Sequence, residues 1–394
     1  MPENTLRIGI LGANSEPIQT IYLPILKSLK DHYQLILLHD PSSSPSSPTT
    51  TTKTTQSTTD LLTNPSINLL LNFLPLSSRE SYTIAALEAG KNVLVQPPLS
   101  PSIQGAKRIL DAEKTRAKDG ARVFVSCVRR HATCFETFQR EVASLDRIYY
   151  ARCRNIAGPG MLGLKDFPPV KSATNGGHIL NGNGGGRSCR SDGVEDTTPN
   201  DLLHEVFDER DLTQARLSLY NFLYSLGCHD LALLRETMGI PDAISSISIN
   251  DPFYSAIFHY NDSRANGNED THRPFTLVYE TGADAIPRCD AHLAVYGQSK
   301  TVTIQYDLPY APNQPVRVIV EERDGENGQV MRRESECSWE ETYRAELTAL
   351  HACLVDGESV KMTTASDGLT DLKLFRRMFE QYGRQCGTIR TPLG

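Results

Sequence analysis

The sequence of 394 residues lacks an apolar run long enough to cross a bilayer. Its longest apolar stretch, residues 67–76, is interrupted by Asn68, Asn72 and Pro75, whereas a membrane helix needs roughly 20 apolar residues. Clusters of Lys and Arg are also missing, and the formal net charge is -7. An anionic membrane or a nucleic acid would need such basic clusters, so we expect neither as a partner.

The first residues offer no leader, and the cysteines follow no regular spacing. Residues 1–6 are polar and run directly into a strand pattern, which leaves no room for the apolar core of a signal peptide, so we expect a cytoplasmic protein. Nine cysteines, an odd number, predict reduced and mostly buried thiols. Cys127, His131 and Cys134 lie close in sequence, but no second pair completes a tetrahedral set, so we predict no metal site.

The first third of the chain alternates short apolar runs with helical patterns, which is typical of βαβ units that form a parallel sheet. Strands are predicted at residues 7–11, 35–38, 67–73, 92–95 and 123–127, and helices at 18–31, 81–89 and 102–118. Gly90 follows the second of these helices and is the residue expected at its C-terminal end.

Two segments interrupt this organisation. Residues 41–59 consist of Ser, Thr and Pro except at Lys53 and Gln56, and this composition predicts a low-complexity, mobile loop. Residues 171–200 contain Gly176, Gly177 and a run of three further glycines, and are predicted to be a flexible insertion.

The remainder of the chain has a different character. A helical stretch at 212–238 precedes strand patterns at 244–249, 255–260, 275–280, 291–296, 301–306 and 316–321, and two helices at 340–354 and 369–382 close the chain. We therefore predict an α/β protein: an N-terminal Rossmann-type, doubly wound parallel sheet, and a C-terminal α/β domain with a mostly antiparallel open sheet. The predicted boundaries are 1–128, 129–365 and 366–394.

A glycine turn follows the first predicted strand. A dinucleotide-binding fold holds a pyrophosphate there on backbone N–H groups at a helix N-terminus. The fingerprint aligns as Gly12, Asn14 and Pro17, so only the tight-turn glycine is kept. Asp40, at the end of the second strand, is placed to accept a hydrogen bond from an adenosine ribose hydroxyl, or is a turn aspartate before Pro41.

Several further motifs carry a family resemblance. They are Asn72-Phe-Leu-Pro75, Ala85-Ala-Leu-Glu-Ala-Gly-Lys91 with Gln96-Pro97-Pro98 after it, Val125-Ser-Cys-Val-Arg129-Arg130-His131, Gly227-Cys-His229-Asp230, Asp290-Ala-His292 and Tyr306-Asp307-Leu-Pro309-Tyr310. In this order they resemble the glucose-fructose oxidoreductase/inositol dehydrogenase/MocA (Gfo/Idh/MocA) family over almost the whole chain. The resemblance implies a Rossmann domain that binds NAD or NADP, with Pro75 and Gln96 beside the cofactor, and a second domain whose sheet carries the substrate pocket and the oligomer surface.

The chain departs from the family at the residue that matters most. The family has Glu-Lys-Pro where this chain has Gln96-Pro97-Pro98, and its lysine contacts nicotinamide and substrate and serves in proton transfer. Proline cannot titrate, and general acid–base catalysis contributes roughly 100- to 10,000-fold in rate. The altered phosphate turn and the Ser/Thr/Pro tract after the second strand add to this loss.

Three side chains are the candidate catalytic residues. His229 is a candidate acid or base toward a ligand, or a hydrogen-bonded core histidine. Arg129 follows a strand end and is suited to hold a carboxylate or polar oxygen, or to form a salt bridge between domains. Tyr306 offers a phenolic donor or packs against Pro309, and Asp230 is expected to cap a helix or to pair with Arg235.

The departures favour an enzyme of small-molecule metabolism that requires no cofactor: a cyclase or isomerase in natural-product biosynthesis, with a Diels–Alder-type ring closure as one example. Such reactions are accelerated by holding the reacting ends together and by one or two hydrogen bonds. One alternative is an NAD(P)-dependent oxidoreductase acting on a CH–OH or C=O group, with His229 as acid or base. The other is a non-enzymatic ligand sensor. The expected partners are a small-molecule substrate and a second copy of the chain in a homodimer.

Overall fold

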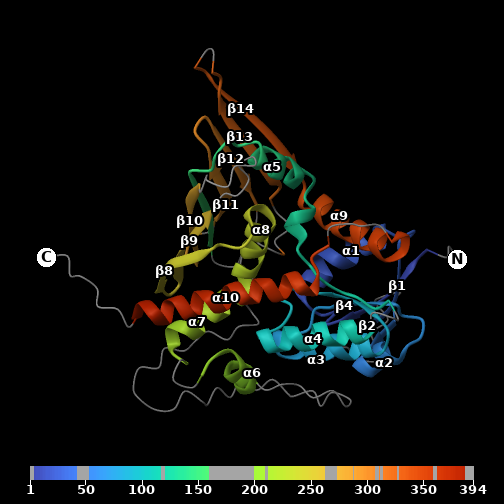
Figure 1. The fold of residues 1–394 in the computed structure, drawn as a ribbon. Helices are drawn as coiled ribbons and strands as arrows, with labels where there is room; N and C mark the ends of the chain where they lie inside the picture. The colour runs from blue at the N-terminus through green and yellow to red at the C-terminus, as the bar shows by residue number, and fades with distance from the viewer. Residues whose placement is uncertain are drawn as a thin grey trace.

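The computed structural model describes residues 4–41, 53–116, 120–158, 199–208, 212–261, 273–286, 288–306, 310, 314–325, 328–357 and 362–386. These residues form two sheets, each with its own helices (Figure 1). None of the helices in the described ranges is both long and apolar enough to cross a membrane.

The first sheet has six strands in the order β3-β2-β1-β4-β5-β6, all parallel. They are β1 (Leu6–Leu11), β2 (Tyr33–His39), β3 (Lys53–Thr55), β4 (Leu69–Asn72), β5 (Asn92–Val95) and β6 (Val123–Val125). All four residues of β4 are buried, as expected for a strand covered on both faces by helices. The predicted Rossmann-type parallel sheet is confirmed.

The helices of this sheet connect its strands. They are η1 (Ile18–Tyr22), α1 (Leu23–Ser28), α2 (Thr58–Thr63), α3 (Leu76–Glu88) and α4 (Ile103–Arg116). Gly90 has a φ of +71° just after α3, so the predicted glycine stop is present. One further helix, α9 (Trp339–His351), packs against α1 although it follows the second sheet in the chain (Figure 1).

The low-complexity prediction is wrong for part of its range. Residues 42–52 lie outside the described residues, but Lys53–Thr55 pairs in parallel with β2 and α2 begins at Thr58. Leu61 of α2 is fully buried in the core, and this apolar burial holds the adjoining polar strand in place. The adenosine side of the sheet therefore has a strand and a helix where the composition predicted a loop.

The second sheet has eight strands in the order β14-β13-β12-β11-β7-β10-β9-β8. They are β7 (Tyr150–Ala157), β8 (Ala243–Asn250), β9 (Phe253–Asn261), β10 (Pro274–Ala283), β11 (Cys289–Tyr296), β12 (Lys300–Gln305), β13 (Val316–Arg323) and β14 (Val330–Cys337). Only β7 and β10 pair in parallel, so the predicted, mostly antiparallel sheet is confirmed.

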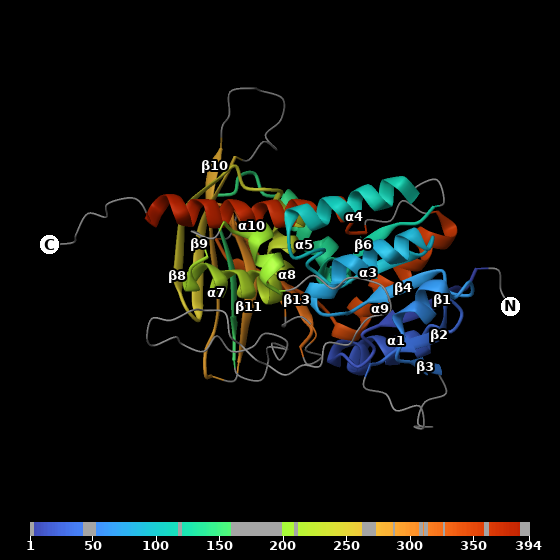
Figure 2. The same ribbon diagram turned by 90° about the horizontal axis from the view of Figure 1, so that it is seen from below.

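The remaining helices surround this sheet or lie between the two sheets (Figure 2). They are η3 (Val128–His131), α5 (Thr133–Ala143), α6 (Pro199–Val206), α7 (Gln214–Phe222), η6 (Leu223–Gly227), α8 (Cys228–Met238), η7 (Ala352–Asp356) and α10 (Ala365–Cys386). The chain runs from α7 through η6 into α8 without a break, as predicted. Of the predicted flexible insertion, residues 171–198 lie outside the described residues and α6 begins at Pro199. The predicted domain boundaries stay a prediction.

Candidate active site

The turn after β1 has a geometry that only glycine accepts. Gly12 has a φ of +76°, and a Cβ atom there would lie 2.6 Å from the carbonyl oxygen of Phe73. The next residue, Ala13, donates its N–H to the carbonyl oxygen of His39 at 2.9 Å. The Gly12 turn therefore lies against the carboxyl ends of both β4 and β2.

Two buried polar atoms near this turn fit a ligand. The hydroxyl of Ser15 and Nδ1 of His39 have no hydrogen-bond partner within the described part of the chain. Buried polar groups are rarely left unsatisfied, so each is suited to contact a bound polar group. Ser15 follows the Gly12 turn, where this type of fold holds a pyrophosphate, and His39 precedes Asp40 on the adenosine side. The residues present therefore fit a dinucleotide.

The sequence-predicted cofactor residues of this turn occupy its rim. Asn14 is exposed, and Asp40 is half-buried with its N–H bonded to the carbonyl oxygen of Thr55 at 3.0 Å. Thr55 belongs to β3, the strand found where the composition predicted a loop, so β3 also fixes the backbone of Asp40.

Asn72 fixes the chain at the end of β4. Its amide donates to the carbonyl oxygen of Arg79 and to Thr83 Oγ1, both at 3.0 Å, and its Oδ1 accepts the N–H of Leu74 at 3.2 Å. Asn72 is fully buried, so these bonds join the strand end to α3 in a dry environment. Pro75, the last residue before α3, is exposed at this edge.

Arg79 brings a positive charge to the segment from which the lysine is missing. Its guanidinium donates to the carbonyl oxygens of Pro97 and Pro98, both at 3.1 Å, and to Gln96 Oε1 at 3.0 Å. The side chain is 5% exposed. A buried cation of α3 therefore holds the end of β5 and the side chain of Gln96.

His229 lies in the first turn of α8 and is 8% exposed. Its ring packs edge-on against Tyr310, with the ring centroids 5.5 Å apart. Burial, followed by the positive charges of Arg129 and Arg79, lowers the pKa of His229 well below its usual value. The imidazole is therefore neutral at pH 7 and offers one donor nitrogen and one acceptor nitrogen.

Arg129 and Tyr306 belong to a buried polar network centred on Asp230. The Arg129 guanidinium lies 2.5 Å from Asp230 Oδ1 and 4.0 Å from the centre of the Tyr306 ring. Asn155 donates to both carboxylate oxygens of Asp230, at 3.0 and 2.9 Å. Burial raises the pKa of Asp230, and Arg129 opposes that effect.

The expected role of Asp230 as a helix cap or partner of Arg235 is wrong. Arg235 instead lies 2.6 Å from Asp371 on α10, which leaves Asp230 to neutralise Arg129 between η3 and α8. The structure thus places Arg129 in an ion pair, whose partner belongs to the same predicted domain, 129–365, and not to the other one. Direct contact of Arg129 or Tyr306 with a substrate stays a prediction.

The predicted site residues form two groups that meet at Arg79. Gly12, Asn14, Asp40, Pro75 and Gln96 lie along the carboxyl ends of the first sheet, and His229, Arg129 and Tyr306 lie on the side of the second sheet. Arg79 contacts Gln96 directly and is close enough to His229 to lower its pKa.

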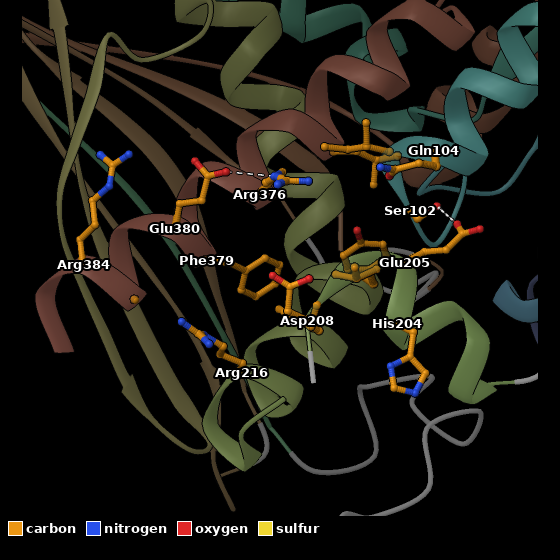
Figure 3. A pocket seen from close by; sticks show the side chains of 16 residues that line it. Ser102, Gln104, His204, Glu205, Asp208, Arg216, Arg376, Phe379, Glu380 and Arg384 are labelled. Atoms are coloured by element: carbon orange, nitrogen blue, oxygen red, sulfur yellow. Dashed lines mark hydrogen bonds and ion pairs between the residues drawn. The ribbon is translucent and has the colours of Figure 1, made fainter. Parts of the chain in front are cut away.

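A separate cavity of about 670 Å³ lies between α4, α6, α7 and α10 (Figure 3). It contains none of the predicted site residues. Several of its polar side chains are bonded to one another: Ser102 lies 2.5 Å from Glu205, and Arg376 lies 2.9 Å from Glu380. The first contact joins the start of α4 to α6, and the second lies within α10. Because these polar side chains already bond one another, we place the active site at the sheet edge instead. Among the described residues no group of three His, Cys, Asp or Glu side chains is arranged to hold a metal ion.

Comparison with known proteins identifies relatives of the first sheet and of the whole fold. Residues 6–125 match the family model described as "Oxidoreductase family, NAD-binding Rossmann fold", GFO_IDH_MocA. Residues 6–125, which contain the first sheet, thus resemble the Gfo/Idh/MocA family. The uncharacterized oxidoreductase YhhX of Escherichia coli K12 is 29% identical to this chain over 126 residues, which are 31% of the chain and 36% of YhhX. The chain thus matches only about a third of that relative in sequence.

Solved structures are similar over nearly the full length of this chain. The structure of YvaA of Bacillus subtilis has a TM-score of 0.64 at 14% identity, with 97% of this chain and 98% of YvaA covered. The structure of YhhX has a TM-score of 0.61 at 18% identity, with 95% and 97% covered. At these identities the likeness shows that the fold is shared, including the second sheet.

Sequence reasoning missed some polar side chains of this candidate site. Arg79 lies four residues after Pro75, in the helix that begins at a strand end, and that position is the signal that points to it. Asn155 lies 75 positions from Asp230, and a bond between such distant segments leaves no signal in the local sequence. Ser15 and His39 could be recognised only from their unsatisfied atoms.

Proposed function

We propose that this chain is an NAD(P)-dependent oxidoreductase that interconverts a hydroxyl and a carbonyl group of a small molecule. The observation that carries the proposal is the position of His229: a buried, neutral imidazole within the influence of Arg79, whose guanidinium also holds the cofactor-side residue Gln96. Acid–base chemistry and cofactor binding thereby meet at one edge of the first sheet.

The cofactor would be held by the first turn and the end of β2. The Ser15 hydroxyl beside the Gly12 turn suits a pyrophosphate, and His39 and Asp40 suit the adenosine ribose. When bound, the nicotinamide supplies or accepts the hydride. The presence of β3 and α2 supports this assignment, because the adenosine side is more complete than the composition implied.

His229 would bind the oxygen of the reacting group. A neutral imidazole donates a hydrogen bond to a carbonyl oxygen or accepts one from a hydroxyl. Arg79 and Arg129 both raise the positive potential at this imidazole, and the same potential stabilises negative charge that develops on a substrate oxygen. Arg79 would thus supply the charge that Pro97 cannot.

The sequence alone favoured chemistry without a cofactor, and we reverse that preference because of the family match and the fit of the first turn to a dinucleotide. Pro97, which cannot titrate, favours a second candidate function, a cyclase or isomerase that uses no cofactor. A cyclase or isomerase needs only an oxyanion-stabilising group such as His229 with nearby cations, and Pro97 does not impede such a reaction.

The test is turnover of NADH or NADPH with a panel of aldehydes and ketones, followed by nicotinamide absorbance. With a substrate identified, we expect His229→Ala to lower kcat by roughly 100- to 10,000-fold. His351→Ala is the matched control, because His351 is equally buried but bonds the backbone of Asn4 at the other end of the sheet. Equal turnover in the wild type and His229→Ala would contradict the assignment, and product formation without nicotinamide would favour the cyclase or isomerase.

A further inference from the structure

The thiols of two buried cysteines, which are far apart in the sequence, lie in contact. The sulfur atoms of Cys134 and Cys337 are 3.2 Å apart, and both side chains are 4% exposed. Cys134 lies in the first turn of α5, and Cys337 is the last residue of β14, 203 positions further along the chain. Both cysteines are free thiols in this structure.

The surroundings make the two sulfurs chemically unequal. Cys134 Sγ lies 3.5 Å from the carbonyl oxygen of Val316, and Cys337 Sγ lies 3.7 Å from Thr342 Oγ1 in the first turn of α9. The hydrogen bond between the two sulfurs lowers the pKa of Cys337 and raises the pKa of Cys134. Cys337 is therefore the nucleophile of the pair and Cys134 the thiol that remains protonated.

The chain next to the pair reaches the surface. Of the four sequence neighbours of the two cysteines, Thr133, Glu336 and Ser338 are exposed, whereas Phe135 is buried. A local opening at the start of α5 or at the end of β14 would therefore bring a small oxidant to Cys337. Cys127 differs in this respect: neither of its sequence neighbours is exposed, and burial raises its pKa to about 11.

We propose that Cys134 and Cys337 form a reversible disulfide when the protein meets hydrogen peroxide. The Cys337 thiolate attacks one peroxide oxygen, the O–O bond breaks, and a sulfenic acid and hydroxide form. The Cys134 sulfur then attacks Cys337 Sγ, the S–O bond breaks, and the S–S bond forms. In sum, two thiols lose two electrons and two protons, and one peroxide becomes two water molecules.

The bond would join two segments that carry site residues. Arg129 lies just before α5, and Tyr343, which accepts the N–H of Tyr310 at 3.1 Å, lies on α9 just after Cys337. The sulfurs need to approach from 3.2 Å to about 2.05 Å, which is a small movement. Oxidation would therefore fix the start of α5 to the start of α9 without rebuilding either element.

The experiment treats the full chain with hydrogen peroxide, blocks remaining thiols, and maps peptides without reduction. We expect a peptide pair linked through Cys134 and Cys337, its disappearance on treatment with dithiothreitol, and a rise of the unfolding midpoint that is lost on reduction. Cys337→Ser should abolish the link, and Cys127→Ser should leave it intact. The peptide map of the wild-type chain tests the disulfide by itself, because it does not depend on the folding of any variant. Oxidation of the exposed Cys386 with no Cys134–Cys337 peptide would overturn the proposal.

Discussion

The guanidinium of Arg79 donates a hydrogen bond to the carbonyl oxygen of Pro97, at 3.1 Å. Pro97 occupies the position at which the family resemblance implies a catalytic lysine, and Arg79 comes from a different element, α3. A positive charge is thus present beside this position although its own side chain cannot carry one. This relationship explains how the site can lack the lysine and keep a cation near His229.

Exchanging this charge between positions tests its role. Arg79→Gln should lower kcat by about 100-fold, because a preorganised donor is lost. Adding Pro97→Lys to Arg79→Gln should recover part of that loss by returning a cation to the same edge. Steady-state kinetics measure both effects, with Arg108→Gln, a half-exposed arginine paired to Glu80, as the control. A folded Arg79→Gln protein with unchanged kcat would show that the charge is not used.

The Gly12 turn should tolerate no side chain. In Gly12→Ala the new Cβ would lie 2.6 Å from a backbone oxygen at a φ of +76°, so we expect loss of NAD(P) binding and reduced stability. Gly90→Ala is the matched control: its φ is +71°, but no atom lies within 4 Å of the new Cβ, so only about 1 kcal/mol of backbone strain is expected. Calorimetric titration and denaturant unfolding measure the two effects, and equal behaviour of the variants would contradict this prediction.

The Arg129–Asp230 pair should be costly to break. Asp230→Ala leaves a buried guanidinium without its carboxylate, and we expect a loss of about 3–5 kcal/mol in the free energy of unfolding. Glu380→Ala removes the partner of Arg376 on the surface of α10, where a pair contributes about 0.5 kcal/mol or less. Urea unfolding of both variants measures the contrast, and similar losses would mean that the buried network is not structural.

Stability should depend on pH through Glu346. This residue is fully buried, accepts hydrogen bonds from Tyr22 at 3.2 Å and Ser126 at 3.1 Å, and has its pKa raised by burial to about 7. The folded chain therefore keeps a proton that the unfolded chain releases from about pH 4.5 upward. The resulting stability is fully present below that pH and is lost as the pH rises to 7, on the order of 3 kcal/mol in all.

Glu346→Gln should remove this part of the pH dependence. The amide keeps the shape of the protonated carboxyl and cannot ionise, so the variant should lose less stability than the wild type between pH 5 and pH 8. Asp371, whose pKa is raised to about 6, contributes in both proteins, so the difference between them is the quantity to measure. Glu336→Gln, at an exposed position, is the control. Parallel stability curves for the wild type and Glu346→Gln would rule out ionisation of Glu346.

Local patterns predicted the strands and helices better than the site. Asn92–Val95 is a continuous, mostly apolar run and is found as predicted, whereas β14 was missed because seven of its eight residues are not buried and its sequence is largely polar. Arg129 and Asp230 are 101 positions apart, and no spacing rule joins them. No spacing rule predicts the partners of Arg79 either. Two of them are the backbone carbonyl groups of Pro97 and Pro98, which follow a different strand.

The most direct test of the account is titration of the purified chain with NADH and NADPH, followed by fluorescence or heat. We predict saturable binding of one of them with a micromolar Kd, which corresponds to roughly -8 kcal/mol, and loss of that binding in Gly12→Ala. Absence of binding up to millimolar nucleotide would contradict the proposed oxidoreductase and leave the cofactor-independent reaction to be sought.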